Sequence, residues 1–168
     1  MNNNLIIVGA GAYGYVVKEI AEAMGTFDKI SFVDDNAQRD DVVGTSHMLE
    51  VFNKDYRYAI VAIGNSVIRK DVMSAIEEYG YEIPVLVHPK AYVSPSSSLG
   101  AGCVTEAMAA VNSNADVGRG CLICAGSIIN HNAQIEDFCQ IDCNAVIGAG
   151  AFVPEGTKVM YGEVVFKK

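Results

Sequence analysis

The stretch "VNSNADVGRGCLICAGSIINHNAQIEDFCQIDCNAVIGAGAFV" (residues 111–153) carries an aliphatic residue at every sixth position. The same spacing extends from Val87 to Val159, and Thr105 is its one interruption. A small residue recurs four positions after each position of the series from 87 to 153: Ala91, Ser97, Cys103, Ala109, Ala115, Cys121, Ser127, Ala133, Cys139, Ala145, Ala151 and Thr157. Repeats of six residues are typical of a parallel β-helix. The sequence therefore predicts a β-solenoid over residues 87–168.

Three such hexads form one triangular coil, so residues eighteen apart stack about 4.8 Å from one another, as neighbouring strands do. Cys103, Cys121 and Cys139 have this spacing at the small, inward position, which predicts one buried column of thiols. A metal site at "CLIC" (121–124) and "CQIDC" (139–143) is the competing interpretation. We disfavour it, because alternate members of these motifs point to opposite sides of the coil wall.

Glycines mark the places where the coils are expected to turn. Gly100, Gly118 and Gly148 each follow an aliphatic position directly, and we expect them at sharp corners with unusual backbone angles. The flat faces between the corners show no notable polarity in the sequence. The six-residue period does not reveal the handedness of the helix.

Strand-like and helix-like segments alternate before the repeats begin. The expected strands cover residues 4–10, 29–35, 58–64 and 83–87, and the expected helices cover 14–25 and 68–80. Strands separated by helices indicate βαβ units on a parallel sheet. We therefore predict an α/β plus β-solenoid fold, with a small Rossmann-like domain at 1–86 and the β-helix at 87–168.

A glycine motif stands at the first strand-to-helix turn. The stretch "VGAGAYGYVV" (8–17) contains Gly9, Gly11 and Gly14 in the pattern G-x-G-x-x-G, which lets a backbone approach a phosphate at a helix N-terminus. Asp34 and Asp35 end the next strand, where an acidic side chain accepts hydrogen bonds from a ribose or a base. The alternative is a structural glycine turn beside a solvated acidic strand end.

A second strand-to-helix turn, "AIGNSVIRK" (62–70), is expected at the same edge of the sheet. It carries Gly64, Asn65 and Arg69. Ligands of α/β sheets bind at this edge, so Arg69 is a candidate phosphate contact. A plain surface arginine explains the same residue equally well.

One histidine, His131, occupies neither the aliphatic nor the small position of its hexad. Its side chain is therefore expected on the outer surface near a corner. An imidazole is well suited to take a proton from an attacking amine or hydroxyl near neutral pH. The alternative is a solvated surface histidine without a role.

Composition excludes several classes of protein. The formal net charge is −8 and no basic stripe is visible, which argues against nucleic-acid binding. We expect no signal peptide before the first strand, and no apolar run approaches the roughly 20 residues of a membrane span. We expect a cytoplasmic protein without membrane insertion. Its odd number of cysteines, five, indicates reduced thiols.

The order of these parts resembles the bacterial sugar O- and N-acyltransferases, the sialic-acid and bacillosamine acetyltransferase family. The residues that carry the resemblance are the glycine motif, "FVDD", "AIGNSVIRK" and "VHPKAYVSPSSSLGAG", followed by coils with an exposed histidine. The resemblance implies a left-handed β-helix and a homotrimer. It also implies acetyl-CoA bound between neighbouring β-helices, and a nucleotide-activated sugar held by the first domain.

Carried over by position, the resemblance makes His131 the general base, with Asn132 beside it. It implies that a main-chain amide near Gly148 and Ala149 supports the developing oxyanion. Family members usually have an acidic residue where this chain has Asn132, a second histidine at the position of Gln140, and a histidine at the position of Tyr13 in the nucleotide-sugar site.

Three functions follow from these observations. The first is acetyl transfer from acetyl-CoA to an amine or hydroxyl of a sugar, by direct attack on the thioester and without a metal. The second is a trimeric nucleotide-sugar-binding protein that has lost catalysis, motivated by Asn132 and Gln140. The third takes the glycine motif as the site of an NAD-dependent oxidoreductase, although no second catalytic domain for a hydride acceptor is visible after residue 87.

Overall fold

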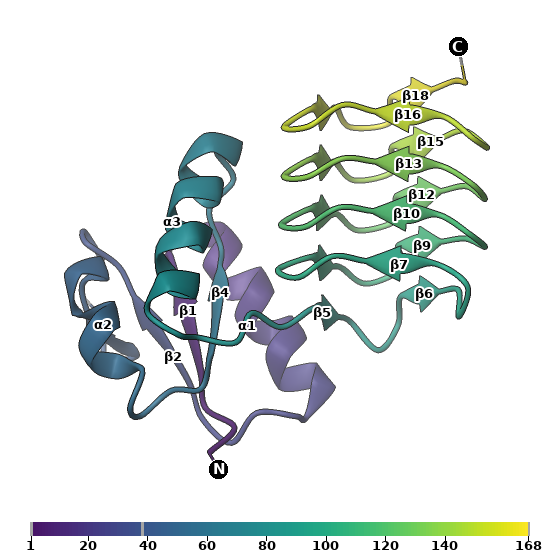
Figure 1. Ribbon diagram of the computed structural model, residues 1–168. Coiled ribbons are helices and arrows are strands. Elements are labelled where there is room, and N and C mark those ends of the chain that lie inside the picture. The colour runs from purple at the N-terminus through teal and green to yellow at the C-terminus, as the bar shows by residue number, and fades with distance from the viewer. Residues whose placement is uncertain (1, 38, 168) are drawn as a thin grey trace. The chain divides into compact units, whose positions relative to one another are not determined.

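The computed structural model describes residues 2–37 and 39–167, and the chain divides into two compact units, Met1–Pro84 and Val85–Lys168. Unit 1 is an α/β unit and unit 2 is a solenoid of stacked coils (Figure 1). The predicted fold class is confirmed: a small Rossmann-like parallel sheet precedes a left-handed parallel β-helix. The division between the units falls two residues before the boundary that the sequence suggested.

A four-stranded parallel sheet with the order β3-β2-β1-β4 forms the centre of unit 1. Its strands are β1 (Leu5–Val8), β2 (Ile30–Val33), β3 (Val42–Gly44) and β4 (Tyr58–Val61). All four residues of β1 are buried, because this strand lies between two others and is covered on both faces. Three strands lie within their predicted ranges, whereas the short edge strand β3 was not predicted.

The helices of unit 1 are α1 (Ala12–Met24), α2 (Leu49–Phe52) and α3 (Ser66–Glu78), with a 3-10 turn η1 at Ser46–Met48. Helix α1 buries Val17, Ile20 and Ala21, which recur at helical spacing on one face. It ends at Gly25, whose left-handed φ of 64° closes the last turn. Both predicted helices are confirmed, and η1 and α2 are additional.

The segment at residues 83–87 does not join the sheet of unit 1. Its strand, β5 (Leu86–Val87), pairs with β8 (Val104–Thr105) in the β-helix, whereas Glu82, just before the segment, forms an isolated bridge to Tyr58. The prediction of a fourth βαβ strand there was wrong. The physical reason is the eighteen-residue register: Leu86 pairs with Val104, just as each strand from β6 to β15 pairs with the strand three hexads on.

Two-residue parallel strands repeat every six residues in unit 2 and form three sheets, β16-β13-β10-β7, β17-β14-β11-β8-β5 and β18-β15-β12-β9-β6. The stacked coils are visible in Figure 1. The strands after β5 and before β12 are β6 (Tyr92–Val93), β7 (Ser98–Leu99), β8 (Val104–Thr105), β9 (Ala110–Val111), β10 (Asp116–Val117) and β11 (Leu122–Ile123). The later ones are β12 (Ile128–Ile129), β13 (Gln134–Ile135), β14 (Gln140–Ile141), β15 (Val146–Ile147), β16 (Phe152–Val153), β17 (Lys158–Val159) and β18 (Val164–Val165).

The aliphatic and small residues of the hexads form the core of the β-helix. The predicted thiol column is confirmed, because Cys103, Cys121 and Cys139 are fully buried, and their Sγ atoms lie 2.9, 3.2 and 3.1 Å from carbonyl oxygens of the next coil. Hydrogen bonding between neighbouring thiols, together with burial, raises the pKa of Cys121 and Cys139. In the described part of the chain, no group of three or more His, Cys, Asp or Glu side chains is placed to hold a metal ion.

The corners of the coils correct one prediction. From Leu99 onward, left-handed backbone angles occur three residues after each hexad position, Thr105 included: at Gly102, Met108, Asn114, Gly120, Gly126, Asn132, Phe138, Asn144, Gly150, Gly156 and Gly162. Gly100, Gly118 and Gly148, where we expected such angles, have none. These three lack a side chain because the next coil leaves no room: a Cβ atom would lie 2.5 Å from a backbone nitrogen at Gly100 and 2.9 Å from a carbonyl oxygen at Gly148.

One outer face of the β-helix is apolar, against the expectation of unremarkable polarity. In the sheet β18-β15-β12-β9-β6 the first residue of each strand points outward and the second points into the core. The outward residues form an apolar row: Tyr92, Ala110, Ile128, Val146 and Val164. The corresponding row of the sheet β16-β13-β10-β7 is mostly polar, with Ser98, Asp116 and Gln134 before Phe152.

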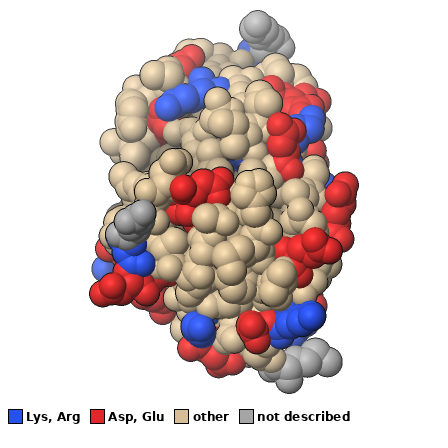
Figure 2. Space-filling model, turned by 90° about the vertical axis from the view of Figure 1, so that its left-hand side faces the viewer, with Lys and Arg blue, Asp and Glu red and all other residues tan. Residues whose placement is uncertain are grey.

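The charged surface agrees with the composition. Figure 2 shows acidic side chains outnumbering basic ones on the face that it draws, in keeping with the net charge of −8. Within residues 2–37 and 39–167, none of the helices has the length and apolar character needed to cross a membrane.

Candidate functional site

A glycine turn joins β1 to α1 at the carboxyl edge of the sheet, where open α/β sheets bind ligands. Gly9 has a φ of 104°, and a Cβ atom there would lie 3.0 Å from the carbonyl oxygen of Ala62. A Cβ atom on Gly14 would collide with the carbonyl oxygen of Gly9. Both glycines are therefore required by the fold, whether or not a ligand binds.

Gly11 is different, because nothing in the fold demands a glycine there. It is the N-cap of α1 with a φ of −73°, and a Cβ atom would meet no atom within 4 Å. A side chain at this position would stand in front of the first turn of α1, whose N–H groups attract anions. The missing side chain keeps these amides accessible. Tyr13 lies half-buried on the same turn.

A cavity of about 360 Å³ opens beside this turn. It brings together four predicted nucleotide-site residues: Gly9, Gly11, Asp34 and Asp35. The second strand-to-helix turn and the helix α3 that follows it contribute apolar side chains to the wall: Ala62, Ile63, Ile68 and Val72. The cavity thus has glycine backbone and carboxylates on one side and an aliphatic wall on the other, which suits a group with a flat apolar body and polar ends.

Asp34 is turned back onto the glycine turn rather than toward open solvent. Its carboxylate accepts hydrogen bonds from the backbone N–H groups of Ala10 at 2.7 Å, Asn36 at 2.8 Å and Ala37 at 2.8 Å. The bond from Ala10, followed by that from Asn36, holds the pKa of Asp34 below its usual value. With three of its acceptor sites occupied, Asp34 fixes the turn and has little capacity left for a ligand.

Asp35, the second acid, is engaged on the other side. Its carboxylate accepts hydrogen bonds from the N–H of Ser46 at 2.8 Å and from the Ser46 hydroxyl at 2.9 Å, at the start of η1. Asp35 remains exposed, and a carboxylate has about four acceptor sites. Two of them stay available to a ligand hydroxyl or amide in the cavity.

The second strand-to-helix turn has a structural role that the sequence did not reveal. Arg69 is not a surface residue: it is 1% exposed, and its guanidinium donates to the carbonyl oxygens of Ile63 and Gly64, both at 2.8 Å. Asn65 caps α3, because its side-chain oxygen accepts a hydrogen bond from the N–H of Ile68 at 3.0 Å. Gly64, Asn65 and Arg69 shape the turn and do not line the cavity.

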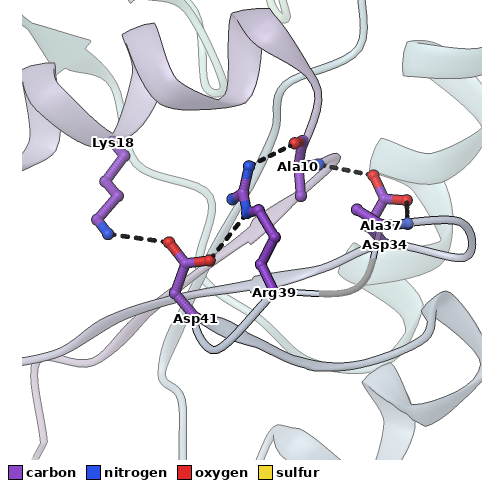
Figure 3. A network of polar contacts seen from close by, with 6 residues as sticks. All are labelled: Ala10, Lys18, Asp34, Ala37, Arg39 and Asp41. Carbon is purple, nitrogen blue, oxygen red and sulfur yellow. Dashed lines mark hydrogen bonds and ion pairs between the residues drawn. The ribbon is translucent and has the colours of Figure 1, made fainter.

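Arg39 is a residue of this site that sequence reasoning missed. Its guanidinium donates to the carbonyl oxygen of Ala10 at 3.0 Å and to Asp41 at 3.1 Å, and Asp41 also pairs with Lys18 at 3.1 Å (Figure 3). No periodicity or motif marks Arg39, because it lies in the irregular segment between β2 and β3. An arginine shortly after an acidic strand end was the only available signal.

His131 lies exposed in the turn between β12 and β13, as its place in the hexad predicted. The turn is held by the neighbouring coils. The N–H of Asn132 donates to the carbonyl oxygen of Ser113 at 3.0 Å, and the N–H of Gly150 donates to that of His131 at 3.0 Å. Ser113, His131 and Ala149 therefore form one column along the corner, about 4.8 Å apart.

Asn132 contacts the imidazole directly, since its Nδ2 lies 2.9 Å from Nδ1 of His131. In this orientation the amide donates to Nδ1, and the ring proton is on Nε2. When the amide turns over, Oδ1 accepts from Nδ1–H and leaves Nε2 free to take a proton. Asn132 also has a left-handed φ of 58°, a conformation that asparagine tolerates well. An asparagine at this position therefore suits the backbone of the turn as well as the contact with the imidazole.

The amide of Ala149 is the available oxyanion donor beside His131. Of the two residues expected to supply it, Gly148 donates its N–H to the carbonyl oxygen of Val165 at 2.8 Å, which leaves it occupied. The N–H of Ala149 makes no hydrogen bond with the rest of the chain that the structure describes. It lies on an exposed turn one coil beyond the imidazole.

The same column ends in a lysine that the sequence analysis passed over. The pairing of Ile147 with Val165 places Lys167 one coil beyond Ala149. Next to it, Gly150, Phe152, Pro154, Val165, Phe166 and Lys167 line a cavity of about 260 Å³. The signal that could have identified Lys167 in the sequence is its spacing of thirty-six residues, or two full coils, from His131.

Comparison with known proteins places this architecture. The family model of the PglD N-terminal domain matches residues 4–76. The acetyltransferase domain of PglB from Neisseria gonorrhoeae is 30% identical over 99% of this chain and 92% of that chain, with a TM-score of 0.87. Its complex with acetyl coenzyme A matches with 31% identity and a TM-score of 0.85, over 98% of this chain and 88% of that chain.

A variant of perosamine N-acetyltransferase from Caulobacter crescentus, in complex with CoA and GDP-perosamine, is also similar. It is 26% identical over 98% of this chain and 89% of that chain, with a TM-score of 0.82. In that variant an asparagine replaces a histidine.

The fold, the exposed histidine in its column and these matches define an acyltransferase of the hexapeptide-repeat type. More specifically, the chain belongs to the bacterial sugar acyltransferase family, as its sequence suggested. This membership favours the acyltransferase interpretation over the NAD-dependent oxidoreductase.

Proposed function

We propose that the protein transfers an acetyl group from acetyl-CoA to an amine or hydroxyl of a nucleotide-activated sugar. One observation carries the proposal: an exposed imidazole, His131, and an unoccupied main-chain amide, Ala149, are neighbours in one column of the β-helix. General base and oxyanion donor are the two groups that direct acyl transfer requires. Similar acetyltransferases in complex with acetyl coenzyme A, and with CoA and GDP-perosamine, supply the substrate class.

The reaction divides between these two groups. Nε2 of His131 takes the proton of the attacking amine or hydroxyl as that atom bonds to the thioester carbonyl carbon. The N–H of Ala149 donates to the carbonyl oxygen as it becomes negative. When the intermediate collapses, the carbon–sulfur bond breaks and the imidazolium returns its proton to the leaving thiolate. Histidine ends neutral, and the proposed step uses neither a covalent enzyme intermediate nor a metal.

The nucleotide of the sugar substrate fits the cavity at the glycine turn. The accessible amides at the start of α1 suit its phosphates, and the aliphatic wall of Ile63, Ile68 and Val72 suits the flat face of a base. Asp35 has free acceptor sites for hydroxyl groups. Asp34, which the sequence assigned to the ligand, acts through the turn instead.

The acyl donor is proposed to lie along the column that holds Ala149. Lys167 offers an exposed ammonium one coil further, beside Phe152 and Phe166, which are 52% and 74% exposed. A cation next to exposed rings fits a long donor whose distal end carries phosphates and a base.

We also propose a cytoplasmic homotrimer. The apolar row consists of Tyr92, Ala110, Ile128, Val146 and Val164. Its middle member, Ile128, lies on β12, which leads directly into the turn of His131, so a second copy covering this row would stand beside the imidazole. Burial of such a face is favourable at about 25 cal/mol per Å² of apolar surface. Light scattering at micromolar concentration is expected to give three chains per particle. A stable monomer would remove this part of the proposal.

The activity is tested by thiol release from acetyl-CoA in the presence of a panel of amino and neutral sugars linked to uridine or guanosine diphosphate. At least one sugar nucleotide is expected to give release above the rate of hydrolysis without acceptor. Mass spectrometry of the product then identifies the acylated atom. If no acceptor supports release while several bind in calorimetry, the protein is a sugar-nucleotide-binding member of the family without turnover.

A further inference from the structure

The guanidinium of Arg39 is held from four sides in unit 1. It donates to the carbonyl oxygen of Ala10 at 3.0 Å and to Asp41 at 3.1 Å, as Figure 3 shows. It also lies 4.1 Å from the ring centroid of Tyr15 on α1 and 5.0 Å from that of Phe32 on β2. A planar group fixed by two hydrogen bonds and two rings has one orientation, which suits a positioning role better than a mobile surface charge.

Asp41 in turn is fixed by two cations. Its carboxylate accepts from Arg39 and from Lys18, each at 3.1 Å, so the chain of contacts runs from α1 through Asp41 to Arg39 and back to the start of α1. Burial opposes the ionisation of Asp41, but the hydrogen bonds from Lys18 and Arg39 outweigh it and lower its pKa. The carboxylate is therefore charged near neutral pH and keeps the guanidinium in place.

Both polar groups of Ala10 are tied by side chains from the segment that follows β2. Its N–H donates to Asp34 at 2.7 Å, and its carbonyl oxygen accepts from Arg39 at 3.0 Å. Ala10 shares its carbonyl with the peptide bond to Gly11. In a trans peptide the C=O and the following N–H point in opposite directions, and no peptide bond in the described chain is cis. Holding the carbonyl oxygen of Ala10 therefore aims the N–H of Gly11 away from Arg39.

The N–H of Gly11 is free to serve a ligand. It makes no hydrogen bond within residues 2–37 and 39–167, and Gly11 lines the cavity of about 360 Å³. The peptide plane before a glycine turns easily as a rigid unit about the flanking ψ and φ, because no side chain restricts the φ of glycine. Unless another side chain holds the carbonyl oxygen of Ala10, the N–H of Gly11 would be accessible but would have no fixed orientation.

We propose that Arg39 is a positioning residue for the sugar nucleotide: it fixes the Ala10–Gly11 peptide so that the Gly11 amide points at the ligand phosphates. The inference rests on the proposed function, because that function supplies the phosphates. Arg39 itself contacts the peptide and is not among the residues that line the cavity of about 360 Å³. Its loss is expected to weaken nucleotide binding and raise the KM for the sugar nucleotide, while the KM for acetyl-CoA stays unchanged.

The test compares Arg39→Ala and Arg39→Lys with a matched control, Arg57→Ala. Arg57 is also ion-paired, to Glu82 at 2.8 Å, and stacked, 5.0 Å from the centroid of Tyr58, but it precedes β4 at the opposite edge of the sheet. Calorimetry with uridine and guanosine diphosphate is expected to show about ten-fold weaker binding for Arg39→Ala, the value of one hydrogen bond to a charged group. Lysine keeps a charged donor but lacks the planar, forked guanidinium. The nucleotide affinity of Arg39→Lys is therefore expected to lie between those of the wild type and Arg39→Ala.

A second measurement needs no ligand. Nuclear magnetic resonance of the ligand-free protein is expected to show the Gly11 amide shifted and exchanging faster in Arg39→Ala, and unchanged in Arg57→Ala. Unchanged nucleotide affinity in Arg39→Ala would overturn the positioning role. If even the wild type binds no nucleoside diphosphate, the proposed nucleotide site has failed. The positioning of the peptide is then decided by the Gly11 resonance alone, and an unchanged signal in Arg39→Ala refutes it.

Discussion

The two turns that carry the proposed chemistry are held in different ways. The turn of His131 is held by its own repeats, since Asn132 donates to the coil below and the coil above donates to His131. The glycine turn is held by side chains from another part of the sequence, Asp34 and Arg39. In the β-helix, the repeat itself fixes the turn of His131, whereas in the α/β unit individual contacts between distant residues fix the glycine turn. A repeat can be recognised in the sequence, but individual long-range contacts cannot.

Replacing the imidazole should produce the largest effect and leave the repeat untouched. His131→Ala is expected to lower the rate of acetyl transfer at least about a hundred-fold, the usual range for loss of a general base. The fold should remain, because the side chain is exposed and the turn is fixed by its backbone. Thiol-release kinetics measure the rate, with exposed His47→Ala in unit 1 as the control. Full activity in His131→Ala would take the histidine out of the mechanism.

The comparison also shows what the sequence was able to predict. The hexad period predicted the β-helix, the thiol column and the exposure of His131, because each depends only on spacing of eighteen. It misplaced the left-handed corners, since Gly100 and Gly148 are glycines for lack of room beside the next coil. The distance between these glycines and the backbone of the next coil cannot be read from the sequence.

In unit 1 the motif located the glycine turn, but the roles of its neighbours required coordinates. Arg69 carries the same charge whether it is exposed or buried, and only the fold turns it onto the carbonyl oxygens of Ile63 and Gly64. Arg39 lies in an irregular segment where no period exists. Asp34 was expected at the ligand, although its carboxylate is occupied by backbone amides.

A side chain at Gly11 should break the glycine turn's function without breaking its fold. Gly11→Val places methyl groups in front of the amides of α1, and affinity for uridine or guanosine diphosphate is expected to fall at least about ten-fold. Its φ of −73° and the open space around a Cβ atom allow the change. Calorimetry on Gly11→Ala and Gly11→Val should show a loss that grows with side-chain size. Equal affinity in all three proteins would argue against phosphate binding here.

The orientation of Asn132 offers a sharper test of the His131 turn. An aspartate at this position can only accept from Nδ1–H, so it keeps Nε2 unprotonated and stabilises the imidazolium that forms. Asn132→Asp is expected to raise kcat about ten-fold, a fraction of the roughly 10⁴-fold seen when such a partner is exchanged in serine hydrolases. The left-handed φ of 58° also admits aspartate. Asn114→Asp, one coil earlier, is the control, and a lower kcat for Asn132→Asp would contradict this account.

Acid should loosen the glycine turn through Asp34. The pKa of Asp34 is lower in the folded protein, first because of the bond from Ala10, so its ionised form stabilises the fold. This contribution is present above the aspartate pKa of the unfolded chain and is lost as pH falls through the lower folded value. Asp34→Asn should remove about 2 kcal/mol at neutral pH and flatten the acid dependence. Amide exchange of residues 9–13 against pH measures both, and an unaltered acid profile in the variant would exclude Asp34 as the cause.

The smallest effect concerns the one interruption of the period. Thr105 stacks between Val87 and Ile123 in the sheet that contains β8, is fully buried, and its hydroxyl has no hydrogen-bond partner among the described residues. An unpaired buried hydroxyl costs about 1–3 kcal/mol. Thr105→Val restores the hexad with nearly the same shape, so the free energy of unfolding of the β-helix should rise by about 1 kcal/mol.

Ser127 is the matched control for Thr105, because it is equally buried but donates its hydroxyl to the carbonyl oxygen of Cys124 at 2.7 Å. Ser127→Ala removes that bond and leaves the carbonyl without it, so this variant should be destabilised by about 1 kcal/mol. Urea denaturation followed by circular dichroism compares the two changes in the same coil stack. Opposite signs would show that periodicity alone holds the core of the β-helix at position 105. A loss of stability in Thr105→Val would instead reveal that this hydroxyl, like the side chains around the glycine turn, makes a specific contact that spacing cannot predict.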